Sequence, residues 1–145
     1  MKFNLDVLLL LIINLFLVNC ANKSSPECLS KLDISNKTTL IIPVKGCQYC
    51  ISESLWFAEK NLENKKITII ITGYISDRDL RLSISEKLYN SSKVRKVNDI
   101  SYFNCQDLVE GKPIYKLKSN KEEIFTIDAY TIENSLKLIS EEILK

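Results

Sequence analysis

Two runs of β-branched and aliphatic residues, at positions 37–44 and 67–72, dominate the hydrophobic pattern in the middle of the chain. Short, continuous runs of this kind are typical of strands buried on both faces of a parallel sheet. Between the two runs, apolar residues recur at intervals of four, three and four: Ile51, Leu55, Ala58 and Leu62. Because that is the spacing of an amphipathic helix, the pattern predicts two strands connected through a helix.

A second helix is predicted to follow the second strand. Ser76 is a candidate N-cap, and Asp79 stands three residues later, where a capping box places its acidic or amide partner. Three apolar residues then lie on one helical face: Leu80, Ile84 and Leu88. The order strand, helix, strand, helix predicts a mainly parallel sheet with helices on its faces.

The last part of the chain predicts an antiparallel hairpin and a terminal helix. A polar turn separates segments 114–117 and 123–127, and Pro113 can open the first strand but could not lie in its middle. The terminal helix has Thr131 as its N-cap and apolar residues at intervals of four, three and four: Ile132, Leu136, Ile139 and Ile143. The segment from about residue 91 to 112 has only scattered apolar positions, and we interpret it as an insertion that could contain one short strand.

Together these elements predict one α/β domain over residues 37–145, with a central mixed sheet of about four or five strands flanked by helices. A length of 145 residues and an apolar content of 46% suit one compact domain. Twenty basic and eighteen acidic residues leave a net charge of +2 with no long run of one sign, which argues against nucleic acid as a partner. The absence of histidine excludes every histidine-based catalytic or metal site.

The N-terminal segment has the pattern of a secretory leader. Residues 7–18 are apolar apart from Asn14, and about twelve such residues are too few for a helix that spans a bilayer, which needs about twenty. We therefore interpret residues 1–19 as a signal peptide that is removed from the mature protein.

The end of this leader, Leu17-Val18-Asn19-Cys20, resembles a bacterial lipobox, in which the cysteine is acylated and becomes the first mature residue. The resemblance implies a lipid anchor on Cys20 and a polar tether over residues 20–36. Asn19 departs from the small residue usual at its position. An ordinary signal peptide with an incidental cysteine is the alternative.

The main candidate for chemistry is the C-x-x-C pair of Cys47 and Cys50, which lies between a predicted strand and a predicted helix. A helix N-terminus presents unpaired N–H groups and the positive end of a dipole, so it stabilises a thiolate and lowers its pKa. Cys28 and Cys105 can bridge each other or remain free. An inert Cys47–Cys50 disulfide and a four-cysteine zinc site are the alternatives, although a structural zinc site usually has a second close-spaced pair.

The order of the predicted elements resembles the thioredoxin-like fold over roughly residues 37–145. This order is a strand, the C-x-x-C pair at the start of a helix, a second strand, a second helix, a hairpin that begins with a proline, and a last helix. In that family a proline, usually cis, opens the hairpin and lies beside the dithiol, and Pro113 holds the matching place. Gly46 stands where many members have tryptophan, and Ile41 stands where thioredoxins have a buried acid. Without that acid, deprotonation of Cys50 depends on water or on another residue, for which Glu53 is a candidate.

The resemblance implies that Cys47 is the nucleophile and Cys50 the resolving thiol. Cys47 is nearer the helix end and Lys45 adds positive charge two residues away. Gln48 and Tyr49 match neither a typical reducing nor a strongly oxidising member, so they leave the redox direction open. Tyr49, between the cysteines, is expected to face solvent and contact a partner protein.

With the lipobox, the chain looks like the membrane-tethered, extracytoplasmic thiol–disulfide oxidoreductases of bacteria. The expected partners are thiols and disulfides of exported proteins and a membrane or periplasmic electron donor, with no bound cofactor or metal. The anchor is compatible with the inner or the outer membrane. The alternative function is a non-catalytic lipoprotein whose cysteines form structural disulfides.

Two aromatic residues of the first predicted helix, Trp56 and Phe57, are expected to lie in or near the hydrophobic core.

Overall fold

The computed structural model describes residues 37–98, 111–117 and 124–145. The predicted signal peptide and tether, with Cys20 and Cys28, lie outside these residues, as does Cys105. Predictions that concern them are therefore neither supported nor opposed by the fold.

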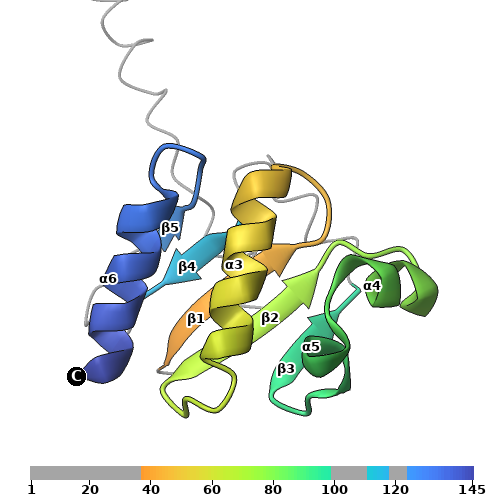
Figure 1. The fold of residues 1–145 in the computed structure, drawn as a ribbon, viewed down its shortest axis with the longest axis horizontal. Helices are drawn as coiled ribbons and strands as arrows, with labels where there is room; N and C mark the ends of the chain where they lie inside the picture. Colours follow the sequence, from red (N-terminus) through yellow and green to blue (C-terminus); the bar gives the residue numbers. More distant parts are fainter. Residues whose placement is uncertain (1–36, 99–110, 118–123) are drawn as a thin grey trace, which may run out of the picture.

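The described strands form one five-stranded mixed sheet in the order β3-β2-β1-β4-β5 (Figure 1). Strand β1 (Thr38–Pro43) pairs in parallel with β2 (Ile67–Thr72), which pairs in parallel with β3 (Val94–Val97). On its other side β1 pairs antiparallel with β4 (Ile114–Lys116), which forms the predicted hairpin with β5 (Ile124–Thr126). The predicted α/β class with a mixed sheet is confirmed, and the topology is thioredoxin-like.

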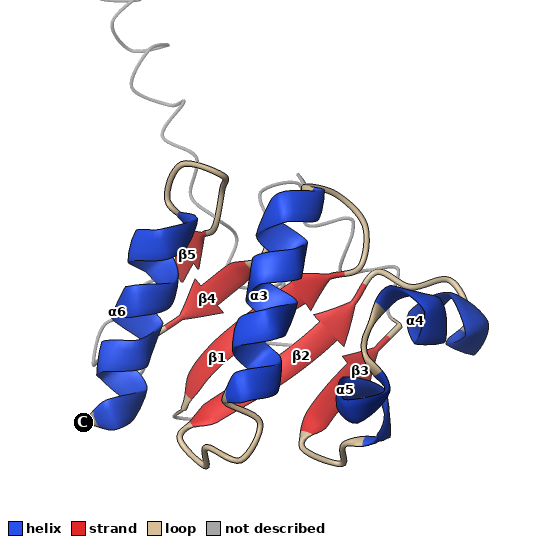
Figure 2. Ribbon diagram, viewed as in Figure 1, coloured by secondary structure: helices blue, strands red, loops and turns tan. Residues whose placement is uncertain are grey.

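Two long helices cover one face of this sheet (Figure 2). Helix α3 (Gln48–Lys60) connects β1 to β2, as the helical spacing predicts, and α6 (Ile132–Leu144) follows the hairpin. Both helices contact β1 and each other. Among the described residues, no helix has the length and apolar character needed to cross a lipid bilayer.

The core between the helices and the sheet is built from alternate strand residues. Leu40 and Ile42 of β1 and Ile69 and Ile71 of β2 pack in one cluster with side chains of α3 and α6. The helices contribute Ile51, Phe57, Ala58, Ile139 and Ile143. Burial of each leucine or isoleucine contributes roughly 1.5–3 kcal/mol, so this cluster fixes the position of α3 on the sheet.

The prediction of a single helix after β2 is wrong in one respect, because this segment forms two short helices. Helix α4 (Asp77–Ser83) ends at Ile84, which has an extended backbone, and α5 (Glu86–Asn90) begins after a new N-cap at Ser85. The Ser85 hydroxyl accepts a hydrogen bond from the Leu88 N–H at 3.3 Å and therefore restarts the helix. The apolar residues that suggested one helix are all buried all the same: Leu80, Ile84 and Leu88.

The segment interpreted as an insertion does contain the short strand that was expected. Strand β3 is the edge of the sheet next to β2, with Val94 buried and Arg95 and Lys96 exposed. Charged side chains on an edge strand discourage pairing with another chain. Residues 99–110 lie outside the described residues.

Candidate functional site

Cys47 and Cys50 form a disulfide at the N-terminus of α3, with their Cα atoms 5.4 Å apart. Cys47 is the N-cap of the helix, and its sulfur accepts a hydrogen bond from the Cys50 N–H at 3.4 Å. The sulfur of residue 47 thus occupies the position of a capping oxygen, where helical N–H groups and the helix dipole favour negative charge. A thiolate formed there on reduction is stabilised.

The two cysteines differ in exposure. Cys47 is half-buried, whereas Cys50 has no exposed surface. A thiol or disulfide of another protein can therefore approach the sulfur of Cys47 more readily than that of Cys50. This difference is the one that distinguishes an attacking from a resolving cysteine.

A close contact between two glycines places the dithiol beside the segment that leads into β4. The Cys47 N–H donates a hydrogen bond to the Gly111 carbonyl oxygen at 2.9 Å. A Cβ atom added to Gly46, whose φ is 136°, would lie 1.9 Å from that oxygen. Only glycine fits position 46, and this contact explains why no larger residue stands before the first cysteine.

Pro113 follows Gly111 by two residues and is buried at the start of β4. Its carbonyl oxygen accepts the Ile127 N–H at 2.7 Å, which ties the hairpin to the segment that leads to α6. No cis peptide bond occurs in the described segments, so the bond before Pro113 is trans, in contrast to the usual family pattern. Gly111, two residues before this proline, contacts the backbone of Cys47.

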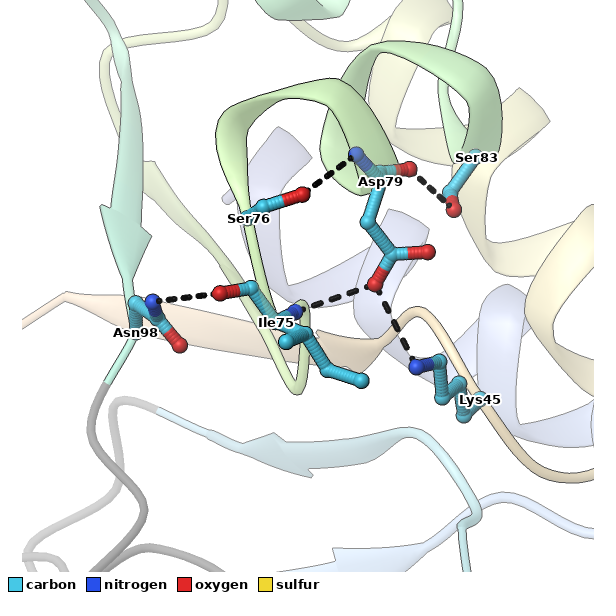
Figure 3. A network of polar contacts seen from close by, with 6 residues as sticks. All are labelled: Lys45, Ile75, Ser76, Asp79, Ser83 and Asn98. Atoms are coloured by element: carbon cyan, nitrogen blue, oxygen red, sulfur yellow. Dashed lines mark hydrogen bonds and ion pairs between the residues drawn. The ribbon is translucent and has the colours of Figure 1, made fainter.

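Lys45 forms an ion pair with Asp79, with 3.3 Å between its Nζ and Oδ2 of the carboxylate (Figure 3). The Ile75 N–H donates to the same oxygen at 3.0 Å. This hydrogen bond, followed by the nearby ammonium group, lowers the pKa of Asp79. Because Lys45 is paired, its positive charge is shared with a carboxylate rather than directed only at Cys47.

The same network ties the loop before Cys47 to the start of α4 and the end of β3 (Figure 3). The Ser76 hydroxyl accepts the Asp79 N–H at 3.2 Å, as the predicted cap requires, and the Ser83 hydroxyl donates to the Asp79 carbonyl at 2.7 Å. The Asn98 amide donates to the Ile75 carbonyl at 3.4 Å. Asp79 therefore holds the loop that positions the dithiol, a role that its capping pattern alone does not reveal.

The aromatic residues of α3 are arranged differently from the prediction in one case. Tyr49 is 51% exposed, as expected for a residue between the two cysteines, and Phe57 is buried. Trp56 is not in the core, since it is 56% exposed and the Lys60 ammonium lies 3.3 Å from its ring centroid. Consecutive helical residues point about 100° apart, so Phe57 and Trp56 could not both face the sheet.

The position expected for a buried acid is apolar, because Ile41 is fully buried in β1. Within the described residues, the buried polar side chains are all uncharged: Thr38, Thr39, Ser54, Thr72 and Ser135. Of these, only Ser54 is on α3, and it lies one turn after Cys50. Sequence reasoning missed it, although a hydroxyl on the apolar face of this helix was a readable signal. Glu53, the acid considered from sequence, is partly exposed.

Cys28 and Cys105, the second candidate cysteine pair, lie outside the described residues. In the segments that the structure describes, no three His, Cys, Asp or Glu side chains are grouped so that they could hold a metal ion.

No protein-family model, curated protein or solved structure matches this chain. The interpretation of the site therefore depends on the fold and on the geometry of the two cysteines.

Proposed function

We propose that the protein is a thiol–disulfide oxidoreductase that acts on exported proteins, with Cys47 as nucleophile and Cys50 as resolving thiol. The observation that carries this proposal is the disulfide at the α3 N-terminus, in which the capping sulfur of Cys47 is partly exposed and that of Cys50 is buried. A structural disulfide has no need of either the helix terminus or the difference in exposure.

In the reducing direction, the Cys47 thiolate attacks one sulfur of a substrate disulfide. A bond forms between Cys47 and that sulfur, and the other substrate sulfur leaves as a thiolate with the electron pair and takes a proton from water. The Cys50 thiolate then attacks the Cys47 sulfur, the Cys47–Cys50 bond forms, and the first substrate sulfur leaves. Two electrons have passed to the substrate, and an external dithiol donor must restore them. The oxidising direction is the reverse of these steps.

The surroundings of Cys47 suit the approach of an extended substrate. Tyr49 is exposed beside the disulfide and offers an aromatic contact to a partner protein. The Gly46–Gly111 contact brings the backbone of residue 111 directly beside the residue that precedes Cys47. A substrate segment could therefore lie across the two cysteines next to Pro113.

The lipobox-like residues before Cys20 support a location outside the cytoplasm, on an inner or outer bacterial membrane. Acyl chains on Cys20 would hold the protein there, since each buried methylene contributes about 0.8 kcal/mol. Residues 20–36 would give the domain reach to exported proteins. Disulfides of exported proteins, the expected substrates, form and persist in such an oxidising compartment.

The proposal is tested with the full-length chain in an insulin-reduction assay supplied with dithiothreitol. Cys47→Ala is expected to abolish the acceleration of insulin reduction, and Cys50→Ala to accumulate a mixed disulfide between residue 47 and insulin. A variant with Cys28→Ala and Cys105→Ala is the control and is expected to keep the activity. Full activity in Cys47→Ala would reject the proposal in favour of a lipoprotein with structural disulfides.

A further inference from the structure

Ser54 is a buried hydroxyl without a hydrogen-bond partner among the described residues. Its side chain has no exposed surface, and its Oγ makes no hydrogen bond in the structure, in which Cys47 and Cys50 are oxidised. A buried polar group left unpaired is costly and uncommon, so it calls for a specific explanation.

Other helical serines show that the lack of a partner is particular to this position. Ser52 of the same helix donates to the Tyr49 carbonyl at 2.9 Å, and Ser83 and Ser140 likewise donate to carbonyl oxygens of the preceding turn. Buried Ser135 hydrogen-bonds with Tyr115. Ser54 could make the same backward bond to the Cys50 carbonyl, yet it does not.

The position of Ser54 on the helix directs it toward Cys50. Residues four apart are neighbours on one helical face, with Cβ atoms about 5–6 Å apart. Side chains in an α-helix also lean toward the N-terminus, so we expect the Ser54 side chain to lie over the turn that carries Cys50. Both residues are fully buried on the inward side of α3.

The other unpaired buried hydroxyl, that of Thr72, does not share this location. Strand residues alternate between faces, and Ile69 and Ile71 of β2 belong to the core cluster beneath α3. Thr72 therefore lies on the opposite face of the sheet with Ile70. Ser54 is the unpaired hydroxyl on the side of the resolving cysteine.

We propose that Ser54 donates a hydrogen bond to the sulfur of Cys50 when the disulfide is reduced, and that it stabilises the Cys50 thiolate in place of a buried acid. A disulfide sulfur is a weak acceptor, whereas a thiolate carries a full charge and takes a charge-assisted hydrogen bond. The hydroxyl thus lacks a partner in the oxidised state and gains one in the reduced state. The catalytic part of this inference rests on the proposed function.

The bond would act at the resolving step. The proton of the Cys50 thiol passes to water, and the resulting thiolate, held by the Ser54 hydroxyl, attacks the Cys47 sulfur of the mixed disulfide. The Cys47–Cys50 bond forms, the bond from Cys47 to the substrate breaks, and the substrate sulfur leaves with the electron pair. Ser54 keeps its own proton throughout, so it orients and stabilises the anion without serving as a base.

The test compares full-length Ser54→Ala with Ser52→Ala, a matched control that removes an exposed hydroxyl from the same helix. The first measurement is the thiol–disulfide equilibrium of Cys47 and Cys50 against glutathione. Ser54→Ala is expected to favour the disulfide about tenfold, which corresponds to about 30 mV toward a more negative potential. The Ser52→Ala equilibrium is expected to stay within twofold of the parent. Alanine is smaller than serine and the best helix former, so the variant is expected to fold.

The second measurement is the pH dependence of Cys50 alkylation in a Cys47→Ala background, followed on the peptide that contains Cys50. The midpoint is expected to move to higher pH in Ser54→Ala and to stay in place in Ser52→Ala. An unchanged equilibrium and an unchanged alkylation profile in Ser54→Ala would overturn the inference. Neither measurement needs a substrate protein, so failure of the insulin assay and failure of this inference are distinguishable.

Discussion

The Cys47 N–H donates a hydrogen bond to the Gly111 carbonyl oxygen at 2.9 Å, and this bond joins the C-x-x-C pair to the segment that leads through Pro113 into β4. The two residues are far apart in the sequence and come from different connections of the sheet. Their contact depends on the absence of a side chain at Gly46, where an added Cβ would collide with the same oxygen. The site is therefore a tertiary arrangement rather than a local motif.

Gly46→Ala is expected to destabilise the protein because it combines a clash with an unfavourable backbone. The φ of 136° is one that residues with a Cβ rarely adopt, and such strain costs about 1–3 kcal/mol before the 1.9 Å contact is counted. Urea denaturation measures the loss. Gly73→Ala, at a φ of 82°, is the control for a positive φ elsewhere. Equal or smaller destabilisation in Gly46→Ala than in Gly73→Ala would contradict the close contact.

Asp79→Asn is expected to make the free energy of unfolding less dependent on pH in the acidic range. The Ile75 N–H and Lys45 lower the pKa of Asp79 in the folded state, so the folded protein holds this proton less tightly than the unfolded chain. The stabilisation is complete above the ordinary pKa of 3.8 and is lost as the pH falls through the lower folded-state value. Urea midpoints between about pH 2 and pH 6 measure this dependence.

Glu141→Gln, which removes an exposed carboxylate from α6, is the control for the Asp79 experiment. It is expected to leave this pH dependence close to that of the parent. If Asp79→Asn and Glu141→Gln gave the same profile, the network around Lys45 would contribute nothing to stability.

Ile42→Ala is expected to cost about 2–5 kcal/mol, because Ile42 is fully buried in β1 within the core beneath α3. Leu82→Ala, at a residue that is 80% exposed, is expected to change the free energy of unfolding by less than about 0.5 kcal/mol. Chemical denaturation of the two variants measures both values. Similar losses in the two variants would mean that β1 does not have the buried position described.

Trp56 is expected to report an exposed indole in the folded protein. It is the single tryptophan of the chain, so intrinsic fluorescence isolates it. Acrylamide should quench the native protein nearly as strongly as the unfolded chain, because Trp56 lies on the outer face of α3 under Lys60. Trp56→Ala should cost no more than about 1 kcal/mol. A native emission protected from acrylamide would place the indole in the core instead.

Much of the fold could be predicted from hydrophobic spacing. The apolar run at 67–72 is strand β2, and the intervals after Gln48 correspond to α3, because both elements bury continuous or periodic apolar surface. The break in the helix at Ile84 could not be predicted from this spacing. Leu80, Ile84 and Leu88 are buried whether one helix continues through them or a new helix begins after the cap at Ser85. Periodicity reports burial and not the continuity of a helix.

The site could be predicted only in its local part. Because a strand, two cysteines and a helical pattern are adjacent in the sequence, the pair could be predicted at a helix N-terminus, and the structure makes Cys47 the N-cap. The contact with Gly111 and the pairing of Lys45 with Asp79 could not be predicted, because each joins segments that only the complete fold brings together. Trp56 and Phe57 were both expected in or near the core, but only one face of α3 meets the sheet, and Phe57 occupies it while Trp56 is exposed.

The central claim, that Cys47 and Cys50 are a redox couple and not a structural brace, is tested most directly by the reduction potential of the pair. The measurement equilibrates the full-length chain with dithiothreitol and glutathione buffers and quantifies the thiols of both residues. We predict a potential above about −300 mV, in the range of exchanging dithiols. A potential below about −300 mV, with resistance to dithiothreitol, is typical of structural disulfides and would contradict the account.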